Sequence, residues 1–153
     1  MTTTVDRLAQ WAIAAYRIAI GLLFFFHGVS TLFAWPVEPH GGSTPGFMAS
    51  PSWWAAMIQL VGGGLIMAGL FTRSAAFLSS GSMAVAYFWR HQGDGLWPIE
   101  NDGELSALFC WALFILVFIG PGKLAVESLI RRWLARGADA AVRESVVPEA
   151  ARS

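Results

Sequence analysis

The sequence predicts an all-α membrane protein, a bundle of four transmembrane helices with a C-terminal cytoplasmic amphipathic helix. Apolar residues make up 56% of the 153 residues, and charged residues make up 13%, about half the share usual in soluble proteins. The apolar residues gather in four long runs, and many of the eight tryptophans lie at the ends of these runs, as in interfacial belts. The predicted spans are residues 8–33, 53–70, 74–89 and 105–119.

The first run, residues 8–33, is long enough to cross a bilayer, which needs about 20 apolar residues. It is too long for a signal peptide and lacks a small-x-small cleavage site, so we expect a retained span. Nearly every polar or small side chain of the run falls on one helical stripe, which should face other helices rather than lipid. The stripe comprises Arg17, Ile20, Gly21, Phe24, His27, Gly28 and Thr31.

The second and third spans should form an antiparallel pair. A loop rich in Pro, Gly and Ser, residues 35–52, precedes the second span. Within that span, Gly64 and Ala68 have the spacing that lets a neighbouring helix approach closely. The turn at residues 71–73 is minimal, which places the second and third spans side by side. The small residues in the first half of the third span indicate a packing face.

The fourth span follows the most polar loop of the chain, residues 91–104. Asn101 and Glu104 have capping-box spacing, which predicts that Asn101 caps this span. A Gly-Pro-Gly stop closes residues 1–122, the predicted membrane domain. Residues 123–136 have one apolar and one basic side, typical of a helix lying in the membrane interface, and residues 137–153 are predicted to be a disordered tail.

Basic residues predict the orientation of the spans. The side shared by both termini carries Arg7, Arg73, Lys123, Arg131, Arg132, Arg136 and Arg143. The opposite side carries Arg90 alone, among several acidic residues. By the positive-inside rule, both termini should therefore be cytoplasmic, in a multi-pass protein of the inner (cytoplasmic) membrane.

Five polar residues are candidates for a site toward the outer end of the bundle: His27, Gln59, Arg90, His91 and Glu104. A histidine, a carboxylate and an amide at the mouth of an apolar bundle could hold and protonate a quinone headgroup, with His27 and Glu104 as the candidate catalytic residues. The structural alternative is that His27 bonds a neighbouring helix and that Glu104 supports the start of its own helix. Polar residues within membranes are functional candidates by default.

Other chemistries have weaker support. Haem ligation by His27 and His91 lacks a haem motif, and no metal site is predicted because the carboxylates and histidines are dispersed. The single cysteine, Cys110, excludes an intrachain disulfide or a dithiol centre. For Arg17, three roles are open at the cytoplasmic end. It could reach lipid headgroups, it could bond the carbonyl-rich ends of the second and fourth spans, or it could hold an anionic ligand at the inner face.

The order and spacing of several segments resemble the DoxX family of membrane proteins. These segments are LFFFHGVSTLF, GGGLIMAGLFTRSAAF, MAVAYF, WPIENDGELSALFC and GPGKLAVE, within residues 16–127. The resemblance implies a four-span bundle and an association with redox enzymes, since DoxX relatives are similar to a subunit of a thiosulfate:quinone oxidoreductase and occur alongside oxidative-stress and thiol-handling proteins. Family-like proteins often carry a lysine where this chain has Thr31.

We therefore expect the integral-membrane subunit of a quinone-linked, oxidative-stress or thiol-handling redox system. Its partners would be the lipid bilayer and a protein that supplies the redox cofactor, or further copies of itself in a homo-oligomer, with no nucleic acid. Two alternatives are open. One is a non-catalytic membrane anchor or assembly factor that recruits a soluble enzyme through residues 123–136, and the other is an oligomeric small-molecule permease.

Overall fold

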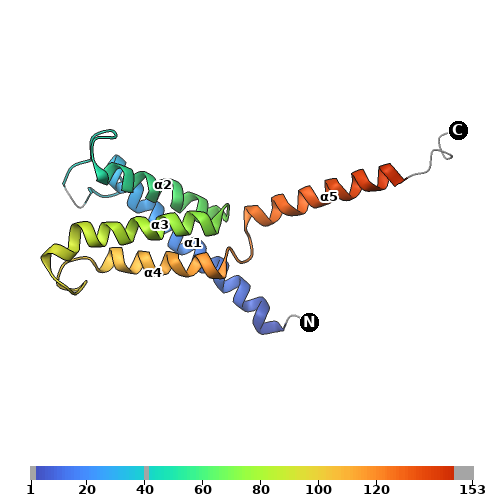
Figure 1. The fold of residues 1–153 in the computed structure, drawn as a ribbon, viewed down its shortest axis with the longest axis horizontal. Helices are drawn as coiled ribbons and strands as arrows, with labels where there is room; N and C mark the ends of the chain where they lie inside the picture. Colours follow the sequence, from blue (N-terminus) through green and yellow to red (C-terminus); the bar gives the residue numbers. More distant parts are fainter. Residues whose placement is uncertain (1–2, 40–41, 147–153) are drawn as a thin grey trace.

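The computed structural model describes residues 3–39 and 42–146, and this part of the chain is helical without any strand. The main helices are α1 (Thr4–Phe33), α2 (Pro51–Ala68), α3 (Thr72–Ala86), α4 (Glu104–Ile119) and α5 (Val126–Val146). A π-helical turn, η1 (Tyr87–His91), and a 3-10 turn, η2 (Gln92–Asp94), extend α3. Helices α1 to α4 form a bundle, and α5 and the start of α1 project from the same end (Figure 1). We call this the α5 end, and the opposite end the loop end.

The predicted stripe on the first span is confirmed as the inward face of α1. Arg17, Gly21, Phe24 and Gly28 are buried, and the other members of the stripe are half-buried. The core beside it joins apolar side chains of all four bundle helices. It includes Phe24, Ile66, Ala76, Met83, Phe109, Leu113 and Leu116.

Three glycines bring α1 and α2 into close contact. A Cβ atom on Gly28 would lie 2.5 Å from the backbone nitrogen of Leu60, and one on Gly63 would lie 2.6 Å from that of Phe25. A Cβ on Gly21 would meet the backbone of α2 at 2.8 Å. The prediction that a neighbouring helix approaches α2 at Gly64 is wrong, because a Cβ atom on Gly64 would contact only the Phe25 ring, at 3.8 Å. The small residue that receives α1 is its neighbour Gly63.

The small residues of α3 form a packing face, as predicted. Ala75, Ala76, Ser79 and Ser80 are buried. The Ser80 hydroxyl donates to the Cys110 carbonyl at 2.8 Å, which joins α3 to α4. The bundle thus consists of two closely packed pairs, α1 with α2 and α3 with α4, and α2 and α3 connect the pairs.

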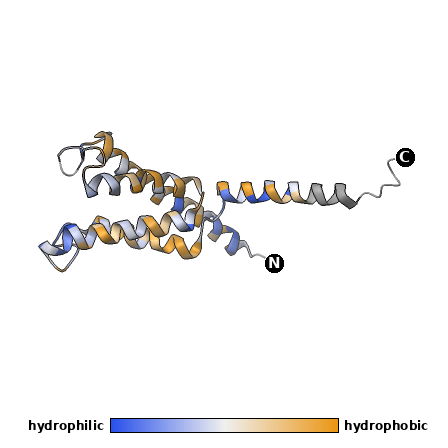
Figure 2. Cartoon of the chain, turned by 45° about the horizontal axis from the view of Figure 1, so that its top comes forward, coloured by the Kyte–Doolittle hydropathy of each residue, from blue (hydrophilic) through white to orange (hydrophobic). Residues whose placement is uncertain are grey.

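Many large apolar side chains of the bundle are exposed on its outside. Much of each bundle helix is coloured as hydrophobic in Figure 2. Among the described residues, α1 is the one helix that is both long and apolar enough to cross a membrane. Helix α4 is also apolar but shorter, with 16 residues.

Helix α5 differs from its predicted extent. It begins at Val126 and continues through Gly137 to Val146. The predicted disordered tail is therefore wrong for residues 137–146, where the backbone is helical, and residues 147–153 lie outside the described residues. The first turn of α5 is attached to the bundle, since the Glu127 N–H donates to the Gly69 carbonyl at 3.1 Å.

Candidate functional site

Arg17 is the central polar residue at the α5 end. Its side chain is fully buried, and its Nη1 donates to the carbonyls of Ile66 and Met67 at 2.8 and 2.9 Å. Its Nη2 donates to the Leu124 carbonyl at 3.2 Å. The last carbonyls of a helix lack partners within the helix and carry partial negative charge, so a guanidinium satisfies both needs. Of the roles expected for Arg17, the structure therefore shows the bond to the carbonyl end of the second span. In place of the end of the fourth span, Arg17 reaches the Leu124 carbonyl, which lies beyond the end of α4.

Gly69 makes room for this guanidinium at the end of α2. It has a positive φ of 73°, and a Cβ there would lie 2.4 Å from Nη1 of Arg17 and 2.7 Å from Cα of Ala125. Only glycine combines this conformation with this proximity. Arg17 and Gly69 together connect α1, α2 and the start of α5.

His27 lies inside the loop end of the bundle. Its ring is half-buried and edge-on to the Phe109 ring, at 5.5 Å between centroids, and Phe24 contacts the same ring at 5.3 Å. Phe109 is in the second turn of α4, whereas Glu104 is the first residue of that helix and is exposed. Five residues of helix span about 7.5 Å, so His27 lies deeper in the bundle than Glu104.

Gln59 lies at the level of His27 on the adjacent helix. It is half-buried on α2, next to Leu60. The backbone of Leu60 lies against Gly28, the residue after His27. Among the five candidates, the structure thus brings His27 and Gln59 to one depth of the α1–α2 pair.

Arg90 and His91 belong to the loops rather than to the bundle interior. Arg90 is exposed and pairs with Asp94 at 3.8 Å. His91 stacks on Tyr87, and its Nδ1 lies 3.0 Å from the Asn101 carbonyl. Both residues lie on the π-helical turn, a geometry that recurs at functional sites.

Asn101 organises the loop before α4 instead of capping that helix. It is buried, its Oδ1 accepts from the Gly103 N–H at 2.9 Å, and its Nδ2 donates to the Gly95 carbonyl at 2.9 Å. The N-cap of α4 is Gly103, with no side-chain cap. The predicted capping role is therefore wrong, because both ends of the amide are engaged within the loop.

No group of three His, Cys, Asp or Glu side chains that could hold a metal ion occurs in the described part of the chain. The bundle instead offers two separate polar positions. The Arg17 guanidinium bonds helix carbonyls at the α5 end, and the His27 imidazole lies among aromatic rings at the loop end.

The geometry defines an all-helical bundle with an apolar exterior and a few buried polar side chains beside its apolar core, and comparison with known proteins gives its family. The model of the DoxX family matches residues 12–92, more than half of the chain. An uncharacterized protein of Haemophilus influenzae is 34% identical over 128 residues, which cover 81% of this chain and 94% of that protein. No solved structure matches. The chain belongs to the DoxX family, which confirms the resemblance, and this family is typically membrane-associated.

Proposed function

We propose that this protein crosses the cytoplasmic membrane four times, with both termini in the cytoplasm, and serves there as the integral-membrane subunit of a quinone-linked redox system. The distribution of side chains supports the membrane part. Arg17 and the hydroxyls of Thr72 and Ser79 are buried, while large apolar side chains around the bundle are exposed. The exposed side chains include Leu22, Leu23, Val61, Phe77, Leu78, Val85, Leu108, Trp111, Ile115 and Phe118.

This distribution suits lipid rather than water. Proteins in water seldom expose extended apolar patches of this kind and seldom bury an arginine that has no carboxylate partner. In a bilayer, by contrast, apolar side chains face the lipid and ionisable groups turn inward.

The lengths of the shorter helices are compatible with spanning. The part of α3 and η1 that lies between Arg73 and Arg90, residues 74–89, gives a helical stretch of about 24 Å. Helix α2 has 18 residues and α4 has 16, or about 27 and 24 Å. Modest mismatch with a hydrocarbon core of about 30 Å is accommodated by local thinning of the bilayer and by flanking residues.

His27 is the observation that carries the redox part of the proposal. An imidazole ring exchanges protons near neutral pH. The ring of His27 lies inside an apolar bundle, against Phe109 and at the level of Gln59. Reduction of a quinone to a quinol takes two electrons and two protons. The partner protein would supply both electrons from its own cofactor. His27 would pass one proton to a quinone oxygen, water at the loop end would supply the second proton and reprotonate His27, and Gln59 would donate a hydrogen bond. Glu104, Arg90 and His91 would bind the quinone as it enters from the loop end.

The test of the redox part is quinone reduction per folded molecule in membranes that contain His27→Ala or Glu104→Gln. Thiosulfate or a dithiol would serve as electron donor, and Gln92→Ala, at an exposed loop position, is the control. We expect normal expression and assembly for all three variants. For His27→Ala we expect a loss of at least about 100-fold in quinone reduction, as for removal of a general acid, and for Glu104→Gln a smaller loss.

Wild-type rates in both site variants would contradict the redox proposal. His27 would then have the structural role of packing between α1 and α4, and the membrane architecture would stand independently.

A further inference from the structure

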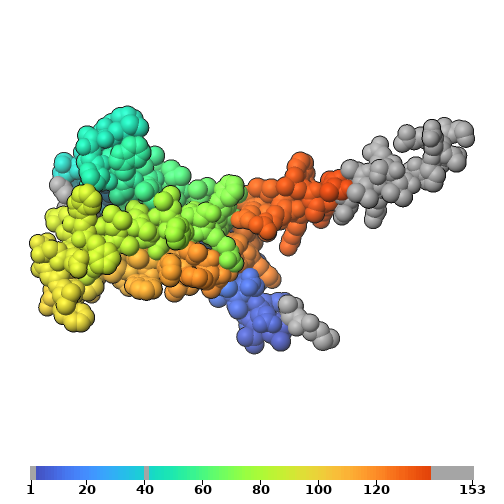
Figure 3. Space-filling view, in the orientation of Figure 1, coloured from blue at the N-terminus to red at the C-terminus, as the bar shows by residue number. Residues whose placement is uncertain are grey.

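We propose that α5 docks on anionic phospholipids of the leaflet from which the bundle emerges. Four large apolar side chains on α5 are exposed: Leu129, Ile130, Trp133 and Leu134. The helix stands apart from the bundle, and its contacts with α1–α4 are few (Figure 3). An apolar stripe of this kind on a well-formed helix marks a surface that is covered in the working state.

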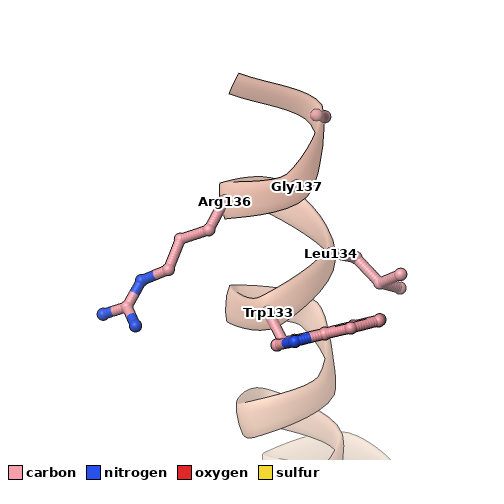
Figure 4. Close-up of a pocket in the computed structure, with 5 residues that line it drawn as sticks. Trp133, Leu134, Arg136 and Gly137 are labelled. Atoms are coloured by element: carbon pink, nitrogen blue, oxygen red, sulfur yellow. The ribbon is translucent and has the colours of Figure 1, made fainter. Parts of the chain in front are cut away.

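The two sides of α5 differ in chemistry. Trp133 and Leu134 point to one side of the helix, whereas Arg136 points to the other (Figure 4). An aromatic and aliphatic side opposite arginines is the pattern of helices that lie at the boundary between headgroups and acyl chains.

The charge of the segment selects a negatively charged occupant. Residues 123–136 contain Lys123, Arg131, Arg132 and Arg136 against the single acidic residue Glu127. Arg131 is engaged by Glu127, one turn earlier on the same helix. Arg132 and Arg136 form no ion pair among the described residues, so they are available to phosphate groups. The rest of α5, residues 137–146, adds Arg143 against Asp139 and Glu144, so five basic residues face three acidic ones over residues 123–146. This remaining positive excess disfavours pairing with the α5 of a second copy.

The position of α5 indicates that the membrane supplies the negatively charged groups that α5 binds. Its start is held at the end of the bundle by the bonds from Arg17 to Leu124 and from Glu127 to Gly69. Beside it, the Lys123 ammonium lies over the Trp11 ring, 5.1 Å from its centroid. Trp and Lys at the ends of spans mark the headgroup level. Helix α5 therefore begins beside the lipid headgroups and extends away from the bundle (Figure 1). Among the described residues its contacts with α1–α4 are few, which leaves it free to lean onto the headgroups beyond its attached first turn.

The experiment measures the depth of α5 in nanodiscs that contain the full-length protein. In a Cys110→Ala background, Leu134→Cys would carry an environment-sensitive fluorophore, and nitroxides on the lipid acyl chains would quench it on docking. Discs of phosphatidylcholine alone are compared with discs that contain phosphatidylglycerol. We expect strong quenching in the anionic discs, weak quenching in the neutral discs, and a decrease as salt is added.

Matched variants separate charge from apolar contact. Each basic residue near an anionic surface changes binding about fivefold, so Arg132→Gln with Arg136→Gln should lower the docked-to-undocked ratio about 25-fold. Glu127→Gln, which adds to the net positive charge, should raise the ratio. Arg7→Gln, at the same end but on α1, should leave it unchanged.

Equal quenching in neutral and anionic discs would overturn the proposal, as would its absence in both. Absence in both would mean that α5 does not dock on lipid, and it would favour a partner protein as the group that covers its apolar side.

Discussion

Arg17 shows how one residue connects three parts of this protein. Its three shortest hydrogen bonds reach the carbonyls of Ile66 and Met67 at the end of α2 and that of Leu124 before α5. Its charge is balanced by backbone carbonyls at the end of α2 and before α5, since the ion pairs in the described part of the chain involve other residues. A guanidinium suits this position better than an ammonium because its fork of N–H groups reaches several acceptors at once.

Replacing Arg17 by Met should therefore destabilise the protein. The carbonyls of Met67 and Leu124 would lose their partner, at about 1–3 kcal/mol for each buried group left unsatisfied, whereas the Ile66 carbonyl would keep the Gly69 N–H at 3.0 Å. Thermal unfolding in detergent would measure the loss of stability, and the Arg17→Lys variant should lose less stability than the Arg17→Met variant. Arg7→Gln, an exposed position, is the control. An Arg17→Met variant as stable as the wild type would show that these bonds contribute nothing net.

At the residue scale, the sequence is a better guide to the buried face of a helix than to the bonding partner of each side chain. The stripe of the first span is recovered because its pattern depends only on helical periodicity. The role of Asn101 is not recovered, because capping-box spacing does not show that the amide already bonds Gly95 and Gly103. Likewise, the spacing of Gly64 and Ala68 does not reveal that the face through Gly63 meets α1.

At the scale of elements, the glycine contacts of α1 and α2 predict a sharp difference between neighbouring positions. Gly63→Ala should separate the helices, because its Cβ would lie 2.6 Å from the backbone of Phe25, and overpacking of this kind costs about 1–3 kcal/mol. Gly64→Ala should be tolerated, because its Cβ meets the Phe25 ring at an ordinary 3.8 Å. The midpoints of thermal unfolding of the two variants test this, and equal midpoints would contradict the packing described.

The start of α1, which precedes the predicted span, should respond to acid. The backbone N–H and the hydroxyl of Thr3 donate to the Asp6 carboxylate, and these bonds lower the pKa of that carboxyl from its ordinary value of 3.8. A lowered pKa means that the ionised group stabilises the helix above its ordinary pKa. This contribution is lost as the pH falls through the lowered value.

Amide hydrogen exchange in residues 4–7 should therefore accelerate relative to the rest of α1 as the pH falls through the lowered pKa of Asp6. In Asp6→Asn this pH dependence should be absent. If the wild type and Asp6→Asn show the same acid response, the capping box at Thr3 does not control the helix start.

The extent of α5 shows a limit of reading helix ends from sequence. Gly137 is a strong stop signal, since glycine commonly follows the last turn of a helix. The helix nevertheless continues to Val146. The residues after Gly137 are rich in alanine, which has the highest helix propensity and offsets the cost of one glycine.

At the scale of the whole molecule, the sequence predicted an all-helical bundle and its antiparallel order, because long apolar runs and short turns determine both. The separation of the bundle into two pairs was not predictable, since it depends on contacts between helices distant in sequence. The candidate site was likewise predictable only in part. His27 was predicted on an inward face, but its contact with Phe109 on α4 required the structure.

The central claim is that the bundle crosses the membrane four times, and labelling of single cysteines in intact cells tests it most directly. In a Cys110→Ala background, cysteines at Ser43 and Gly95 would probe the loop end, and cysteines at Ser74 and Ala138 the α5 end. An impermeant thiol reagent should label Ser43→Cys and Gly95→Cys from outside, and the other two only after lysis. Labelling of Ser43→Cys or Gly95→Cys only after lysis, or of Ser74→Cys or Ala138→Cys in intact cells, would contradict the four-span architecture with cytoplasmic termini.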